Sequence, residues 1–257
     1  MKKIFFYYSL LLVFCFHIHV GAQSHSSNYK YELIKMDSTY EGGADLTIET
    51  YLLHLKQEKD KKMGTIIGVS REALSSFSPQ SPLSNLLVDM LFDWGNDYLS
   101  KKKIGHADFA LLNFGGIRAS LPQGNITVGD IYQISPFENT VSFVFAKGSE
   151  LQKMFDSFSE KRNAVMANVK TVYMNGKLHS LTVGGMPLES DKIYIFVTIN
   201  FLAFGGDDFL RGVDFESVLY LDAPVRDIFI DEIAKRTAQG IEIESNIDDR
   251  VKILPSQ

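Results

Sequence analysis

Cysteine is almost absent from this sequence of 257 residues, which contains only Cys15. No disulfide can form within the chain, so a folded domain must be stabilised by its buried core. Without residues 1–22, discussed next, the chain keeps 257 − 22 = 235 residues. That length is ample for one domain with a substantial core.

The single cysteine lies in a hydrophobic leader. Lysines at positions 2 and 3 precede an almost entirely apolar run over residues 4–20, and the small pair Gly21 and Ala22 follows it. The run is short for a transmembrane helix, and its order of charge, apolar run and small residues predicts a secretory signal peptide over residues 1–22. An uncleaved membrane anchor is the alternative. Because Cys15 lies inside the apolar run, we do not expect a lipoprotein.

Positive charge is also scarce. Without the leader the chain has 24 basic and 31 acidic residues, a net charge of 24 − 31 = −7. This balance argues against a protein that binds nucleic acid by neutralising its phosphates. An exported chain without cysteine suits a bacterial periplasm or cell surface better than a eukaryotic extracellular space, and we expect no membrane span after signal cleavage.

Histidine is sparse and scattered. Only His25, His54, His106 and His179 remain outside the leader, and none has a second histidine at the spacing of a metal site. A two-metal hydrolytic centre needs a dense set of histidines and carboxylates. We therefore expect no metal site and no cofactor in this chain. A Gly-x-Ser-x-Gly elbow, which would indicate a serine hydrolase, is also missing.

Apolar periodicity predicts strands and helices that do not alternate regularly. This pattern is typical of an α+β fold, and we expect a single domain over residues 45–257 with a mixed sheet and flanking helices, after an N-terminal tail over residues 23–44. Helices are expected near 45–62, 81–98, 149–158 and 222–240, with a further short helix that starts at residue 127, and strands near 65–69, 109–112, 141–145, 171–174, 177–183, 193–199 and 250–254.

Capping and turn residues predict several boundaries. Ser81-Pro82 is a typical helix start, and Thr127 and Ser149 each precede a polar partner three residues later, as in a capping box. Asn175-Gly176 indicates a tight hairpin turn.

Two of the expected buried strands are each followed by a glycine pair, Gly115-Gly116 and Gly205-Gly206. Glycine allows positive φ and a close approach of the main chain to a ligand. Either pair alone is consistent with a plain turn. Together, with amide, carboxylate, aromatic and arginine side chains beside them, they indicate a binding cleft.

Three segments resemble those of the 5′-nucleotidase family in order and spacing: Asn113–Arg118, Ser135–Asn139 and Asn200–Phe209. Ser81–Leu86 is also similar to the Leu-Gly-Asn-Leu helix start of that family, and the resemblance extends over roughly residues 46–254. It implies the C-terminal, substrate-binding domain of that family.

The resemblance implies a set of nucleotide-binding residues. Phe137 and Phe201 would sandwich the base, and each stack contributes about 1 to 3 kcal/mol. Asn113 and Arg118 would contact the nucleotide, and Asp207 would accept hydrogen bonds from the ribose. The glycines expected at this site are Gly115, Gly116 and Gly206.

The sequence departs from the family in three places. Pro79 and Gln80 stand where the family places an arginine that helps to hold ribose or phosphate. Asp208 replaces the second glycine of a Gly-Asp-Gly-Phe motif, and Ser84 replaces the glycine of the helix start. Because an arginine is lost and a carboxylate gained, we expect a nucleoside to bind about as well as its monophosphate.

The family's metal-binding motifs, Asp-x-His, Gly-Asn-His-Glu and Gly-His-x-His, do not occur in this sequence. We therefore expect a domain that binds nucleotides or nucleosides but is inactive alone, and that supplies substrate recognition to a separately encoded metallophosphatase acting on nucleotides or UDP-sugars. Divalent metals are expected only in that partner. The alternatives are a stand-alone exported nucleotide- or nucleoside-binding protein without catalytic activity, and a relic that keeps the fold without a ligand.

Overall fold

A computed structural model describes residues 30–35, 37, 45–159 and 162–254. The expected signal peptide and residues 23–29, 36 and 38–44 of the expected tail lie outside the described residues. The chain divides after Thr50 into two units. The expected helix near 45–62 is α2 (Leu46–Met63), which crosses that division and has no buried residue.

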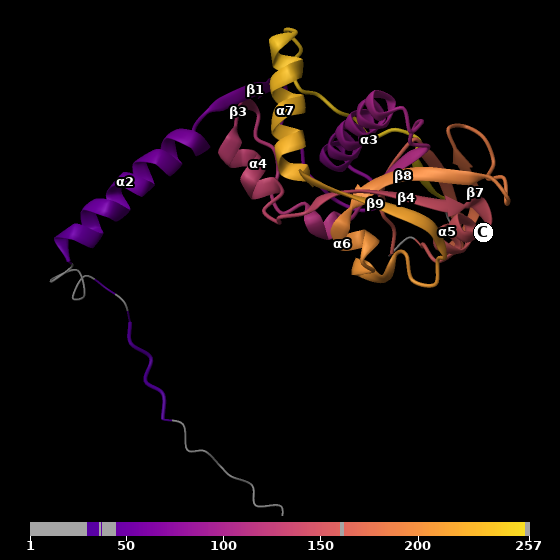
Figure 1. Ribbon diagram of the computed structural model, residues 1–257, viewed down its shortest axis with the longest axis horizontal. Helices are drawn as coiled ribbons and strands as arrows, with labels where there is room; N and C mark the ends of the chain where they lie inside the picture. Colours follow the sequence, from indigo (N-terminus) through magenta and orange to yellow (C-terminus); the bar gives the residue numbers. More distant parts are fainter. Residues whose placement is uncertain (1–29, 36, 38–44, 160–161, 255–257) are drawn as a thin grey trace, which may run out of the picture. The chain divides into compact units, whose positions relative to one another are not determined.

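The largest sheet is mixed (Figure 1). Among the described residues its strand order is β5-β2-β8-β4-β9, in which β2 and β8 are parallel and the other neighbours are antiparallel. The strands are β5 (Val165–Ala167), β2 (Phe109–Leu112), β8 (Ile193–Ile199), β4 (Thr140–Lys147) and β9 (Phe215–Pro224). The mixed sheet and its helices confirm the α+β prediction.

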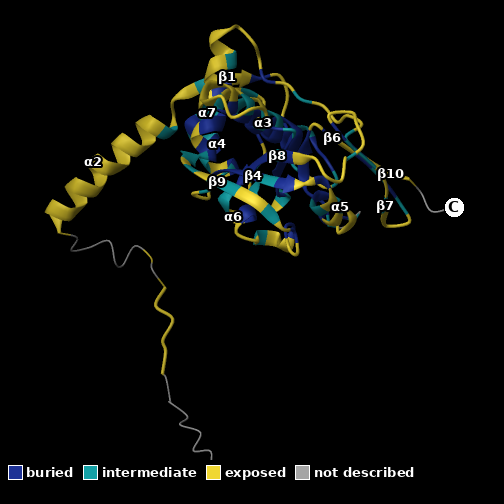
Figure 2. Cartoon of the chain, turned by 45° about the vertical axis from the view of Figure 1, so that its right-hand side comes forward, coloured by how far each residue is buried: buried dark blue, intermediate teal, exposed yellow. Residues whose placement is uncertain are grey.

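Helix α3 (Pro82–Lys102) packs on this sheet, and α7 (Val225–Ala238) packs against α3. Residues at the centre of this arrangement are buried (Figure 2). A Cβ atom on Gly95 of α3 would lie 3.1 Å from a methyl group of Val197 in β8, so the glycine allows close approach of helix and sheet. The predicted start of α3 is confirmed, because Ser81 and Ser84 form a capping box and a proline occupies the first turn.

The described residues also form two smaller sheets. One has the order β10-β6-β7, formed by β10 (Val251–Leu254), β6 (Val169–Met174) and β7 (Lys177–Val183). The other pairs β1 (Ile66–Ser70) with β3 (Gly124–Thr127). The predicted hairpin turn is confirmed, since Asn175 and Gly176 join β6 to β7 with φ of 53° and 72°.

The capping prediction is right for α4 (Val128–Ile134), where Thr127 and Asp130 form a capping box. It is wrong for α5 (Gly148–Asp156), whose N-cap is Lys147 and has no side-chain cap. The amides of Gly148 and Ser149 donate instead to backbone carbonyls in the turn before β8, 2.9 and 3.0 Å away. Tertiary contacts satisfy the amides that a local capping box would otherwise satisfy.

Strand β4 departs from its prediction as well. The alternation over 141–145 predicted one apolar face, but residues 141–144 are all buried. Tyr98 of α3 stacks on Phe143 with ring centroids 5.7 Å apart, and α5 and α6 (Asn200–Ala203) also contact the strand. Strand β9, which covers the outer edge of β4, was not predicted because its apolar and polar residues lack a clear alternation.

Candidate functional site

The two glycine-pair segments meet at one edge of the large sheet. Strands β2 and β8 are parallel neighbours, so both end at the same edge. Asn113 directly follows β2, and its Nδ2 donates to the Asp207 carboxylate at 2.7 Å. The interaction joins residues 94 positions apart in the sequence. This contact brings the two predicted segments together.

Phe201 lies on the short helix α6, which directly follows β8. Its ring lies directly against Gly206, because a Cβ atom at that glycine would overlap three atoms of the ring. Gly205 has a different requirement: its φ is 96°, which favours glycine. The two glycines therefore serve separate purposes, one for the turn and one for the position of the Phe201 ring.

Gly116 supports Asn113 in a similar way. A Cβ atom on Gly116 would lie 2.8 Å from Asn113 Oδ1, closer than real Cβ atoms come to other atoms. Gly115 and Gly116 belong to the 3₁₀ turn η2 (Phe114–Gly116). The Gly115 carbonyl accepts a hydrogen bond from Arg118 NH1 at 3.3 Å.

A pocket of about 200 Å³ opens at this edge. Phe137 and Phe201 both line it and remain 48% and 43% exposed, so neither ring is packed in the core. The volume is below the about 300 to 1,000 Å³ typical of drug-sized ligand sites, so the pocket suits one ring system rather than a whole nucleotide. Its lining residues are Asn113, Gly115, Gly116, Phe137, Asn139, Phe201 and Asp207.

Two predicted site residues do not line this pocket. Gly206 contacts it indirectly, through the Phe201 ring. Arg118 is exposed and lies outside the lining, and its guanidinium donates to the Gly115 carbonyl. Asn139 lines the pocket although it was not singled out from the sequence.

Asn200 connects the segments that carry the two phenylalanines. Its Oδ1 accepts from the amide of Thr140 at 3.2 Å and from the amide of Phe201 at 2.8 Å. Thr140 directly follows the Ser135–Asn139 segment. One side-chain oxygen therefore links both walls of the pocket, a function that the sequence alone did not assign to Asn200.

Arg226, at the start of α7, holds the segment that carries Phe137. Its side chain is only 7% exposed. NH1 donates to the carbonyls of Ser135 and Pro136, both at 3.3 Å, and NH2 donates to the Glu138 carboxylate at 2.5 Å. Burial by itself would lower the pKa of Arg226, but the hydrogen bond and charge of Glu138 raise it above its ordinary value. Phe137 is thus flanked on both sides by residues bound to one buried arginine.

A second arginine, Arg162, holds the turn that carries Asp207. Its NH2 donates to the carbonyls of Asp207 and Asp208 at 3.3 and 2.6 Å. Both aspartates have φ of 55°, a left-handed conformation that costs non-glycine residues about 1 kcal/mol each. Hydrogen bonds from a guanidinium offset that cost. Neither Arg162 nor Arg226 stands out in the sequence, because no local pattern links them to the site.

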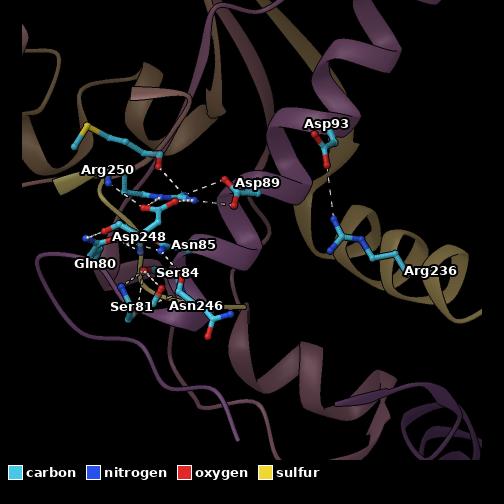
Figure 3. Close-up of polar contacts among 11 residues, drawn as sticks. Gln80, Ser81, Ser84, Asn85, Asp89, Asp93, Arg236, Asn246, Asp248 and Arg250 are labelled. Carbon is cyan, nitrogen blue, oxygen red and sulfur yellow. Dashed lines mark hydrogen bonds and ion pairs between the residues drawn. The ribbon is translucent and has the colours of Figure 1, made fainter. Parts of the chain in front are cut away.

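Gln80, which stands in the region of the family's arginine, does not line the pocket and instead lies among polar side chains that include Asn85 and Asp248 (Figure 3). It is buried, and its Nε2 donates to the carbonyls of Asp248 and Val251 at 2.6 and 3.0 Å. Its Oε1 accepts from Asn85 Nδ2 at 3.3 Å. Gln80 therefore ties the start of α3 to the C-terminal segment.

Arg250 reinforces the same connection (Figure 3). It donates to both Asp89 carboxylate oxygens at 2.9 Å and pairs with both oxygens of Asp248 at 2.9 Å. Burial tends to raise the pKa of Asp248, but the hydrogen bonds from Arg250 lower it below the ordinary value. The polar groups around the start of α3 are thus occupied in stabilising the fold.

In the part of the chain that the structure describes, no group of three or more histidine, cysteine, aspartate or glutamate side chains could hold a metal ion. Over the same residues, no helix combines the length and apolar character needed to cross a membrane.

Comparison with known proteins identifies relatives. The family model for the C-terminal domain of 5′-nucleotidases matches residues 62–212. The chain is 36% identical over 108 residues to Protein UshA of Yersinia enterocolitica and 34% identical over 113 residues to a 5′-nucleotidase of Vibrio cholerae. These matches cover 40% and 42% of this chain but only 20% of each relative.

Solved structures share the fold. The 5′-nucleotidase precursor of Thermus thermophilus matches with a TM-score of 0.65 and 24% identity, over 84% of this chain and 45% of that one. The NAD nucleotidase of Haemophilus influenzae matches with a TM-score of 0.61 and 19% identity, over 90% of this chain and 48% of that one. The described fold therefore corresponds to about half of each of these longer proteins.

Proposed function

This chain belongs to the family of 5′-nucleotidase C-terminal domains, and on that premise we propose that it binds nucleotides or nucleosides between Phe137 and Phe201. The observation that carries the proposal is the shared pocket. Two half-exposed phenylalanine rings, from segments far apart in the sequence, line it together with Asn113 and Asp207. Exposed aromatic rings that line one pocket are typical of ligand-binding grooves, and a flat base would stack on them.

The chemistry of the pocket suits a base attached to a sugar. Each aromatic stack contributes about 1 to 3 kcal/mol regardless of the base. The Asp207 carboxylate accepts one hydrogen bond from Asn113 and has further lone pairs to accept from ribose hydroxyls. Asn113, Gly115 and Gly116 line the same pocket and Gly206 supports the Phe201 ring, while Arg118 reaches a nucleotide only if its exposed side chain turns.

The described residues contain no set of ligands that fits the two-metal centre of a hydrolase. We therefore derive no hydrolytic step from this chain. Its proposed part is substrate recognition for a separately encoded metallophosphatase, exported to the same bacterial periplasm or cell surface by the leader at residues 1–22.

A stand-alone nucleotide- or nucleoside-binding protein is the second candidate. The observation that favours it is the loss of the family's arginine, since Gln80 is committed to the C-terminal segment. Such a protein would capture its ligand without passing it to an enzyme.

Calorimetric titration of the mature chain with adenosine and uridine tests the binding site. Phe201→Ala should weaken binding by about 1 to 3 kcal/mol, which is roughly 5- to 150-fold. Phe204→Ala is the matched control, because Phe204 lies three residues away, is 72% exposed, stacks on Tyr220 and does not line the pocket. Binding that is equally strong in wild type and Phe201→Ala would refute the proposed site.

A further inference from the structure

The pocket lined by Phe137 and Phe201 is called the aromatic pocket below. A second pocket of about 360 Å³ adjoins it. The two pockets share Gly115 and Asp207 as lining residues. The new part of the lining includes Ser78, Arg162 and Asn163. None of these three residues was expected at the site from the sequence.

Asn163 has unused hydrogen-bonding capacity. It is only 5% exposed, its Oδ1 accepts from the Ser78 hydroxyl at 3.1 Å, and its Nδ2 has no partner within the described residues. Rotating the amide by 180° would let Nδ2 donate to Ser78 and would free the Ser78 hydroxyl hydrogen. In either orientation the pair keeps at least one donor group unused, and buried donors in native proteins normally have partners.

Arg162 adds a positive charge without a carboxylate partner among the described residues. Among the described residues its guanidinium donates to the backbone carbonyls of Ser157, Asp207 and Asp208, which carry no net charge. The acidic side chain that shares the pocket, Asp207, accepts from Asn113 instead. A guanidinium beside a spare amide or hydroxyl donor is a suitable environment for a phosphate oxygen.

The order of the groups matches the order of parts in a nucleotide. A ligand that fills both pockets must pass the shared residue Asp207. We propose that the pocket formed by Ser78, Arg162 and Asn163 binds the phosphate of a nucleotide whose base lies between Phe137 and Phe201 and whose ribose lies at Asp207. The inference rests on the proposed function.

The proposal explains how this chain manages without the family's arginine. Ser78 directly precedes Pro79 and Gln80, the region where the resemblance places that arginine, and Arg162 reaches the same pocket from the segment that follows α5. It also changes the expectation drawn from the sequence. A monophosphate should bind about tenfold more tightly than its nucleoside, the lower end for a charge-assisted contact because the Asp207 carboxylate opposes the phosphate.

The test is calorimetry with AMP, adenosine and inorganic phosphate on the mature chain and three variants. Wild type should prefer AMP over adenosine about tenfold. Arg162→Gln and Ser78→Asp should each remove that preference. Ser78→Asp should have little effect on adenosine binding, because Ser78 is exposed and lies outside the aromatic pocket. Arg211→Gln is the charge-matched control, since Arg211 is exposed, pairs with Asp208 and lines neither pocket.

The outcomes separate the two proposals. Equal binding of AMP and adenosine by wild type, or an AMP preference that survives both Arg162→Gln and Ser78→Asp, would overturn the phosphate pocket and leave the nucleoside site intact. Failure of both ligands to bind wild type would overturn both proposals. Inorganic phosphate that competes with AMP but not with adenosine would support the pocket, whereas phosphate that binds without displacing AMP would place its site elsewhere and count against it. Arg162 also holds the Asp207 turn. If Arg162→Gln lowers the melting temperature, the result for Ser78→Asp decides the test.

Discussion

Replacement of Arg226 by alanine should loosen the segment that carries Phe137. The change removes hydrogen bonds to the carbonyls of Ser135 and Pro136 and the ion pair with Glu138. Glu138 is 79% exposed and is rehydrated by water, so its loss of a partner costs little. The two carbonyls lose bonds to a charged donor worth about 1.5 kcal/mol each. We therefore expect the free energy of unfolding to fall by about 3 kcal/mol.

The effect on ligand binding follows from the same contacts. Without Arg226 the Phe137 ring must be ordered at the moment of binding, which costs about 1 kcal/mol of conformational entropy and weakens binding about fivefold. Glu138→Gln is the control: it keeps the size of the side chain and removes only the charge, and its exposed position predicts a loss below about 1 kcal/mol.

Urea unfolding followed by circular dichroism measures the stability, and calorimetry with adenosine measures the binding. The reasoning would be refuted if Arg226→Ala changed stability by less than Glu138→Gln does. It would also be refuted if the alanine variant bound adenosine as tightly as wild type while remaining folded, because Phe137 would then be positioned by other contacts.

Three further predictions concern a glycine, a buried tyrosine and catalysis. Gly206→Ala should displace the Phe201 ring and weaken nucleoside binding at least as strongly as Phe201→Ala. In the control Gly205→Ala, the new Cβ atom would lie in open space, so this change should cost about 1 kcal/mol of stability through the positive φ and affect binding less. Similar binding losses in both variants would argue against the ring contact. Burial raises the pKa of Tyr173 to about 12, so the neutral phenol stabilises the fold fully below pH 10 and this contribution is lost as the pH rises toward 12. Relative to Tyr173→Phe, wild type should lose about 1 kcal/mol of unfolding free energy between pH 9 and 11 in denaturant titrations, and parallel pH profiles for the two proteins would contradict it. The purified mature chain, with or without divalent metal, should release no phosphate from AMP or UDP-glucose above background in a colorimetric assay; metal-dependent release that copurifies with the chain would reveal a metal site that its sequence does not suggest.

Local signals in the sequence determined much of the secondary structure. Ser81 and Thr127 cap helices through partners three residues away, and Asn175-Gly176 turns a hairpin by its own backbone preference. These features depend on neighbours in the chain, so they can be predicted from sequence alone. The motifs also indicated the pocket residues Asn113, Phe137, Phe201 and Asp207, which the fold brings to one edge of the sheet.

Other features depend on residues that meet only after folding. Ser149 has the pattern of a cap, yet its amide is satisfied by the turn before β8. Arg226 contacts carbonyls 91 and 90 positions away, and Arg162 contacts the Asp207 turn 45 positions away. A guanidinium on a helix or loop gives no periodic or spacing signal of its future acceptors. The sequence alone therefore identified both aromatic rings and the polar groups of Asn113 and Asp207 at the pocket, but not Asn139. Only the tertiary structure decided which arginines hold these groups in place, because a long charged side chain finds its partners by three-dimensional proximity rather than by chain order.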